Sequence, residues 1–118
     1  MRVLLIDDEK ELVTTLSERL DLRGIANDWV TSGGDAGLEM IRKEPYDWVV
    51  VDLKMPGLSG FESIKAIKEL RPETRVILLT GHSAAEDLDH ALELGADRYL
   101  VKPVDIDVLL SLMQAENI

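Results

Sequence analysis

The chain has no cysteine among its 118 residues, which excludes disulfide bonds and thiolate metal sites. It also lacks an apolar run of about 18 residues, the length that a membrane-spanning helix needs. Two acids, Asp7 and Asp8, interrupt the first apolar stretch too early for a secretory signal. We therefore expect a cytoplasmic protein that makes no membrane contact.

Basic residues are scarce: 13 Lys and Arg stand against 23 Asp and Glu, which gives a net charge of −10. Because phosphate contacts need clustered Lys and Arg, this balance argues against direct binding of nucleic acid. The hydrophobic content of 46% and the charged content of 31% are ordinary for a globular domain. We expect residues 1–118 to form a single domain with one α/β fold.

Apolar stretches predict five strands, and the spacing of Leu and Ile predicts five helices that alternate with them. Residues 49–51 are three consecutive valines, which suits a strand buried on both faces. The strands are expected at residues 2–6, 25–31, 47–52, 75–80 and 98–102, and the helices at residues 9–23, 33–43, 60–71, 84–94 and 106–115. This alternation predicts a parallel sheet covered by helices on both faces.

Short polar residues are expected to cap several of these helices. Ser32, Ser83 and Asp105 precede the second, fourth and fifth helices, and Ser59 opens the third. The spacing in the fourth helix predicts an inward-facing apolar set: Leu88, Ala91 and Leu92.

Polar side chains stand where four of the apolar strands stop. They are Asp7 and Asp8 after the first strand, Asp52 at the end of the third, Thr80 at the end of the fourth and Lys102 at the end of the fifth. Open parallel α/β sheets bind their ligands outside the carboxyl ends of the strands. We therefore expect these five residues to converge on one site.

The residue types at this site predict a hard cation and phosphoryl chemistry. Three crowded carboxylates repel one another, and oxygen ligands suit an ion such as Mg²⁺. One such ion together with Lys102 would neutralise the three acids. A carboxylate beside a metal ion and a lysine can attack a phosphoryl group and form an aspartyl phosphate, whose oxygens the Thr80 hydroxyl can bind.

Each of these residues also has a purely structural explanation. Asp7 and Asp8 can cap the first helix, Lys102 can be a solvated surface lysine, and Thr80 can end a strand or cap a helix. Tyr99 suits a core position. The alignment of so many polar residues at one sheet edge favours a site over these separate explanations.

The motifs at these positions resemble the receiver domain of bacterial two-component response regulators, of the chemotaxis-receiver type. They are Asp7-Asp8, the run Asp52-Leu53-Lys54-Met55-Pro56-Gly57-Leu58-Ser59-Gly60, then Thr80-Gly81 and Tyr99-Leu100-Val101-Lys102-Pro103. The motifs occur in the family's order and spacing, and the resemblance covers essentially the whole chain. It implies a flavodoxin-like, doubly wound (βα)5 fold with strand order 2-1-3-4-5.

The resemblance also implies roles for individual residues. Asp52 would be the phosphoacceptor, and Lys102 would pair with the phosphoryl group. Mg²⁺ would be held by Asp8, Asp52 and the backbone carbonyl of Lys54, and by Asp7 mainly through water.

Further roles concern the response to phosphorylation. By resemblance, Thr80 and Tyr99 form the switch pair, in which Thr80 moves toward the phosphate and Tyr99 turns inward. The peptide bond before Pro103 would be cis. Lys54 and His82, each two residues beyond a site residue, would tune how long the phosphate lasts.

The partners that the resemblance implies are a sensor histidine kinase or a phosphotransfer protein, and an output domain or effector. The fourth helix, fifth strand and fifth helix would form the output face, through which two copies can also pair. Such a domain catalyses its own aspartyl phosphorylation and dephosphorylation and is not a turnover enzyme.

Three other functions compete with this interpretation. A phosphatase-type hydrolase with an aspartyl nucleophile commonly needs a second acid two residues later, where this chain has Lys54. A flavin-binding module needs a phosphate-cradling loop after the first strand, where the acids 7–9 would repel phosphate. A degenerate receiver could serve as a docking domain without phosphorylation.

Overall fold

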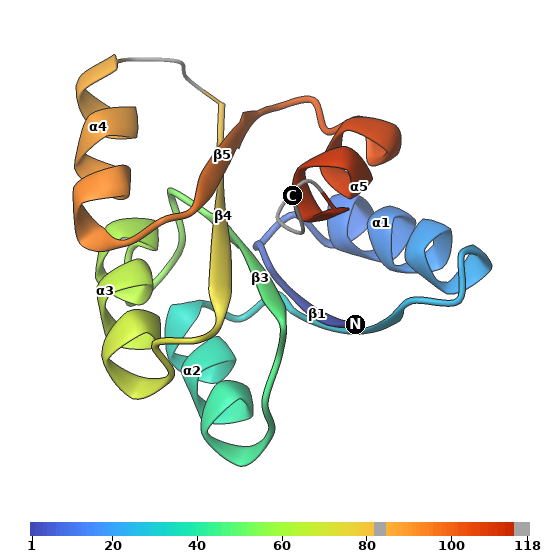
Figure 1. Ribbon diagram of the computed structural model, residues 1–118, viewed down its shortest axis with the longest axis horizontal. Helices are drawn as coiled ribbons and strands as arrows, with labels where there is room; N and C mark the ends of the chain where they lie inside the picture. The colour runs from blue at the N-terminus through green and yellow to red at the C-terminus, as the bar shows by residue number, and fades with distance from the viewer. Residues whose placement is uncertain (82–84, 115–118) are drawn as a thin grey trace.

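The computed structural model describes residues 1–81 and 85–114, which form a five-stranded sheet with helices on both faces (Figure 1). The strands are β1 (Arg2–Ile6), β2 (Ala26–Val30), β3 (Trp48–Asp52), β4 (Arg75–Thr80) and β5 (Arg98–Val101). The helices are α1 (Lys10–Leu22), α2 (Gly34–Lys43), α3 (Gly60–Leu70), α4 (Ala85–Leu94) and α5 (Ile106–Gln114). The predicted alternation of strand and helix is confirmed, and no element end differs from its prediction by more than one residue.

The sheet is parallel throughout and has the order β2-β1-β3-β4-β5, which confirms the predicted fold. β3 lies at the centre, where Val50 pairs with Leu5 of β1 and with Ile77 of β4. The strand order reverses between β1 and β3, and such a reversal opens a crevice at the carboxyl edge of the sheet. The fold therefore places any ligand site beside the ends of β1 and β3.

Two apolar cores lie on opposite faces of the sheet, and successive residues of β3 alternate between them. Val49 and Val51 face the core formed with α2, α3 and α4, whereas Trp48 and Val50 face the core formed with α1 and α5. Figure 1 shows α2, α3 and α4 on one side of the sheet, with α1 and α5 on the other. A strand covered on both faces has no solvent side, which explains the unbroken run of valines.

Two of the predicted helix caps are confirmed. The Ser59 hydroxyl accepts a hydrogen bond from the Glu62 backbone at 3.2 Å, and the Glu62 carboxylate accepts one from the Ser59 backbone at 3.1 Å. This reciprocal pair is a capping box. At α5, Asp105 Oδ1 accepts a hydrogen bond from the Asp107 backbone at 2.8 Å.

Two other local predictions are wrong. Ser32 does not cap α2: the N-cap is Gly33, whose φ of 128° suits glycine, and its Cβ would lie 2.6 Å from the Pro56 carbonyl oxygen. Leu92 is 45% exposed, although its neighbours Leu88 and Ala91 are buried as predicted. The predicted cap Ser83 lies outside the described residues.

None of the helices in residues 1–81 and 85–114 is long and apolar enough to cross a bilayer.

Candidate phosphoacceptor site

Four strand ends deliver the predicted site residues to the carboxyl edge of the sheet. Asp7 follows β1 directly, Asp52 and Thr80 are the last residues of β3 and β4, and Lys102 follows β5. The backbone N–H of Lys102 donates to the Thr80 carbonyl at 2.8 Å, so the ladder between β4 and β5 continues to the lysine. The sheet register thus fixes these residues side by side although they are distant in sequence.

The backbone after Asp52 folds back tightly over the end of β3. Gly60 N donates to the Leu53 carbonyl at 2.9 Å, and a Cβ on Gly60 would lie 2.6 Å from the Asp52 carbonyl oxygen. Only a residue without a side chain fits this approach without moving the backbone. Gly60 therefore lets the start of α3 hold the acidic strand end in place.

Asp7, Asp8 and Asp52 form one acidic cluster. Each contributes a carboxylate oxygen, and these three oxygens lie within 4.8 Å of one another. Asp7 and Asp52 are buried, with 1% and 7% of their surface exposed, whereas Asp8 is exposed. The predicted convergence of the three acids is therefore found in the structure.

Lys102 lies against this cluster. Its ammonium Nζ is 3.0 Å from Asp7 Oδ2 and 3.3 Å from Asp52 Oδ1, and its side chain is 19% exposed. A third carboxylate, that of Glu9, lies 2.5 Å from the same nitrogen. One cation thus serves several acids, which leaves the site with excess negative charge.

The pKa values of the buried acids reflect this excess. Burial and, after it, the Asp7 charge raise the pKa of Asp52 to about 6, while Lys102 acts in the opposite direction. Burial also raises the pKa of Asp7, against the hydrogen bond that Asp7 accepts from the Glu9 backbone. Burial lowers the pKa of Lys102, but its carboxylate partners outweigh this effect and the pKa is raised. Both buried acids are therefore harder to ionise than in water.

The donor set fits a hard divalent cation. Asp7 Oδ2 is buried and makes no hydrogen bond, although the Lys102 ammonium is within ion-pair distance. Apart from this ammonium, no described group lies within hydrogen-bond distance of Asp7 Oδ2, so the oxygen can accept a further ligand. Three carboxylate oxygens at this spacing match the oxygen ligands of Mg²⁺ or Ca²⁺.

The acids open into a hollow of about 380 Å³ at the sheet edge. Its lining includes Thr80, which is 1% exposed, and Lys54, which is exposed at the rim. Tyr99, on β5, does not line this hollow. Its side chain is 42% exposed, so it does not take the core position expected for it. The Lys102–Pro103 peptide bond is cis. His82 lies outside the described residues.

Glu9 is the site residue that the sequence interpretation missed. It lines the hollow and contacts Lys102 across 93 positions of the chain. The signal that could have revealed it is the third acid in the run 7–9. From the sequence we expect these acids to repel phosphate, and nothing in the run predicts that one of them pairs with Lys102.

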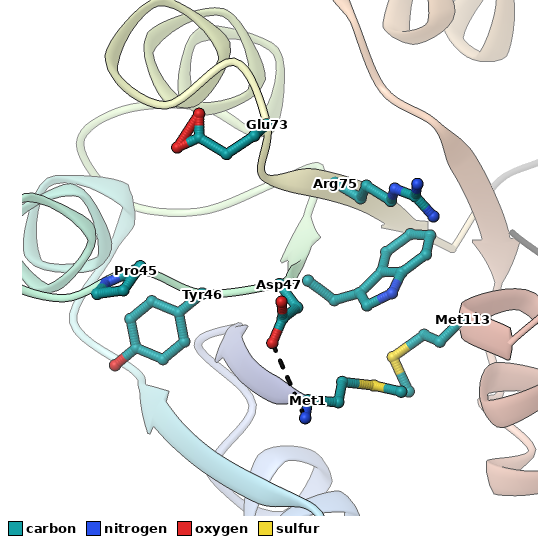
Figure 2. Close-up of a pocket in the computed structure, with 8 residues that line it drawn as sticks. Met1, Pro45, Tyr46, Asp47, Glu73, Arg75 and Met113 are labelled. Atoms are coloured by element: carbon teal, nitrogen blue, oxygen red, sulfur yellow. Dashed lines mark ion pairs between the residues drawn. The ribbon is translucent and has the colours of Figure 1, made fainter. Parts of the chain in front are cut away.

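A larger hollow, of about 540 Å³, lies at the opposite edge of the sheet, where the strands begin (Figure 2). The Arg75 guanidinium lies over the Trp48 ring at 5.8 Å, and the terminal amine of Met1 is 4.0 Å from Asp47. None of the predicted site residues lines this hollow. Size therefore does not identify the site in this molecule, and the clustered charges do.

Comparison with known proteins supports the same assignment. The family model of the response regulator receiver domain matches residues 3–114. The transcriptional regulatory protein DltR of Streptococcus agalactiae is 38% identical over 111 residues, which cover 94% of this chain and 49% of DltR. The chain thus spans about half the length of this curated relative.

Solved structures give the same result. A response regulator protein from Burkholderia pseudomallei, crystallised with a phosphorylated aspartic acid, calcium ion and citrate, matches with a TM-score of 0.90 and 30% identity. That match covers 98% of this chain and 67% of the other. A CheY-like receiver domain protein from Methanospirillum hungatei matches with a TM-score of 0.92 and 28% identity, covering 98% and 91% of the two chains. With the acidic cluster, the paired lysine and a family match along nearly its whole length, this chain belongs to the receiver domain family of two-component response regulators.

Proposed function

We propose that residues 1–118 act as one receiver unit that accepts a phosphoryl group on Asp52, with Mg²⁺ bound by Asp7, Asp8, Asp52 and the Lys54 carbonyl. The donor is a phosphohistidine of a sensor kinase or a phosphotransfer protein. The observation that carries this proposal is the buried Asp52 carboxylate, flanked by the Lys102 ammonium at 3.3 Å and by two further acids.

The transfer requires few protein groups. An Asp52 oxygen attacks phosphorus, and the phosphorus–nitrogen bond of the phosphohistidine breaks. The electron pair of this bond stays on the imidazole nitrogen, which takes a proton from solvent, so the histidine leaves as a neutral imidazole. Lys102 stabilises the charge on the transferring oxygens, and bound Mg²⁺ would supply further positive charge there. The Thr80 hydroxyl, at the end of the neighbouring strand, is placed to bind a phosphoryl oxygen.

Loss of the phosphate completes the cycle by hydrolysis of the aspartyl phosphate. Lys54 lies exposed at the rim of the hollow, where it can affect the approach of water. We propose that Lys54 tunes this rate, together with His82. A protein of this kind returns to its starting state and releases no product other than inorganic phosphate.

The output face proposed for this switch is α4, β5 and α5. Three exposed apolar residues support it, because they come from these elements in turn: Leu92, Tyr99 and Val108. The Tyr99 side chain is exposed in this structure, so we take this to be the unphosphorylated position from which it turns inward when Thr80 binds a phosphoryl oxygen. The relative DltR is a transcriptional regulator about twice as long, so we infer an output domain or a second copy as the partner of this face.

The direct test is incubation with acetyl phosphate and Mg²⁺, followed by intact-mass spectrometry. We expect the chain to gain one phosphoryl group and Asp52→Asn to gain none. Asp47→Asn is the matched control, because Asp47 precedes the opposite end of the same strand. Equal mass gain in all three proteins would reject Asp52 as the acceptor, and steady turnover of a generic phosphate ester would favour a phosphatase instead.

A further inference from the structure

The ammonium of Lys102 has a closer partner than the proposed phosphoacceptor. Its nitrogen lies 2.5 Å from Glu9 Oε1, against 3.3 Å from Asp52 Oδ1. The contact joins the start of α1 to the end of β5, so the two residues meet only in the folded chain. This pairing occupies the cation that a phosphoryl group on Asp52 would need.

Glu9 reaches Lys102 from a fixed backbone. It is the N-cap of α1: its carbonyl accepts from Val13 N at 3.2 Å, and its own N–H donates to Asp7 Oδ1 at 2.9 Å. Both ends of the residue's peptide unit are thus hydrogen-bonded, and the side chain projects into the hollow of the site. The position of the carboxylate follows from the start of the helix.

Glu9 is also distinct from the cation ligands. Within residues 1–81 and 85–114, the acids whose oxygens cluster closely enough to share a metal are Asp7, Asp8 and Asp52, without Glu9. The Glu9 side chain is 59% exposed, and its carboxylate contacts the lysine. Its partner in the site is therefore the ammonium.

We propose that Glu9 is a positioning residue that competes with Asp52 for the Lys102 ammonium in the unphosphorylated protein and thereby limits the rate of phosphorylation. This inference rests on the function proposed above. Phosphorylation replaces the single charge of Asp52 by a group with close to two negative charges, which needs the ammonium more strongly. For Lys102 to turn to the phosphoryl oxygens it must leave Glu9, and the abandoned carboxylate then repels the new charge.

The size of the effect follows from the exposure of Glu9. Because an exposed ion pair contributes only weakly, removing it changes a rate by a factor of about 5 or less. We therefore expect Glu9→Gln to accelerate phosphorylation by about 2- to 5-fold.

In the acetyl phosphate reaction, the bond between Asp52 oxygen and phosphorus forms, the phosphorus–oxygen bond to acetate breaks, and acetate leaves with the electron pair.

The experiment measures the rate of mass gain with acetyl phosphate and Mg²⁺ in four proteins: the unchanged chain, Glu9→Gln, Glu9→Asp and Glu11→Gln. Glu9→Asp keeps the charge but shortens the side chain by one methylene, so we expect it to lose the contact and react faster, as Glu9→Gln does. Glu11→Gln removes an equal charge from the first turn of α1 and should react at the unchanged rate. An unchanged rate in Glu9→Gln, or a Glu9→Asp rate equal to that of the unchanged chain, would overturn the proposal.

A second measurement needs neither metal nor phosphodonor. In metal-free protein labelled at lysine with ¹³C, the Cε signal of Lys102, assigned by its absence in Lys102→Met, should shift in Glu9→Gln and stay in place in Glu11→Gln. No shift in Glu9→Gln would show that the pairing is absent in solution and would overturn the proposal. If the unchanged chain gains no phosphoryl group, the proposed function fails; if it does and Glu9→Gln reacts no faster, only the role of Glu9 fails.

Discussion

Asp52 is a carboxylate in a place that disfavours its charged form. Its pKa is raised to about 6, first by burial and then by the charge of Asp7. In metal-free protein the cost of ionising Asp52 therefore grows as the pH rises from 3.8 to about 6 and is present in full above that pH. The rise from 3.8 to about 6 sets an upper limit of roughly 3 kcal/mol, because one pKa unit is about 1.4 kcal/mol. We expect Asp52→Asn to stabilise the metal-free protein at pH 7.5 by about 1 to 3 kcal/mol.

Urea denaturation in a buffer with a chelator measures this gain. Asp89→Asn serves as the control, since Asp89 is exposed on α4 and its substitution should change stability by less than about 0.5 kcal/mol. A metal-free Asp52→Asn protein that is no more stable than the unchanged chain would mean that Lys102 already compensates the cluster fully.

Tyr46 is a second residue that affects stability through a pKa, because its hydrogen bond lowers the pKa of Asp28. Its buried hydroxyl donates to Asp28 Oδ2 at 2.7 Å, and this bond is the main reason that the pKa of Asp28 is lowered. A lowered pKa in the folded state stabilises the protein above the ordinary value of 3.8, and that contribution is lost as the pH falls below it. We expect Tyr46→Phe to lose about 1 to 2 kcal/mol at pH 7, because the bond is made to a charged acceptor.

The same comparison at pH 3 provides the check. At this pH, below the ordinary value of 3.8, Asp28 takes up a proton more readily in the unfolded chain than in the folded protein. The stability difference between Tyr46→Phe and the unchanged chain should therefore narrow. Urea midpoints at the two pH values report it. A difference of the same size at both would show that Tyr46 acts through packing rather than through the hydrogen bond.

Among the elements, α3 is the helix whose start most directly supports the site. Its capping box of Ser59 and Glu62 stands next to Gly60, which packs against the end of β3. We expect Ser59→Ala to lower stability by about 1 kcal/mol, since the orphan N–H groups of the first turn lose a partner. Ser32→Ala, at the serine that does not cap α2, should change stability by less than about 0.5 kcal/mol, and equal losses in the two variants would contradict the cap assignment.

The difference between these two serines shows where sequence patterns stop being informative. Ser59 was correctly placed at the start of α3, and its cap is local, since it depends on residues three positions apart. The cap predicted at Ser32 was wrong because the backbone of Gly33 approaches the Pro56 carbonyl. This contact joins two separate segments, so no local pattern contains it. In the same way, the spacing of α4 indicated an apolar face but not its orientation, so the exposure of Leu92 was missed.

At the scale of the whole molecule, β1, β3 and β4 were predictable because each is covered on both faces and is therefore apolar along most of its length, whereas the edge strands β2 and β5 are partly exposed. The site was predictable for a related reason: a polar residue that follows such a strand can only emerge at the sheet edge, as Asp52 does. The pairing of Glu9 with Lys102 was beyond the same reasoning, because both side chains are long and their contact depends on rotamers rather than on register.

Binding of a cation should couple the site to the stability of the whole fold. Asp8 and Asp52 come from segments that the unfolded chain holds far apart, so a divalent cation would find this cluster of carboxylate oxygens only in the folded state. A ligand that binds only the folded state stabilises it by about 2.7 kcal/mol at 100 times its Kd. We therefore expect the urea midpoint to rise steadily with Mg²⁺ concentration and to return on addition of a chelator.

Asp8→Asn separates this coupling from the stability of the fold itself. Because Asp8 is exposed, its neutral variant should unfold within about 0.5 kcal/mol of the unchanged chain in metal-free buffer. In Mg²⁺ it should show much less stabilisation, since one of the three clustered oxygens then belongs to a neutral amide side chain. A stabilisation by Mg²⁺ that is equal in both proteins would place the ion elsewhere on this acidic molecule, whereas its loss in Asp8→Asn locates the ion at the ends of β1 and β3.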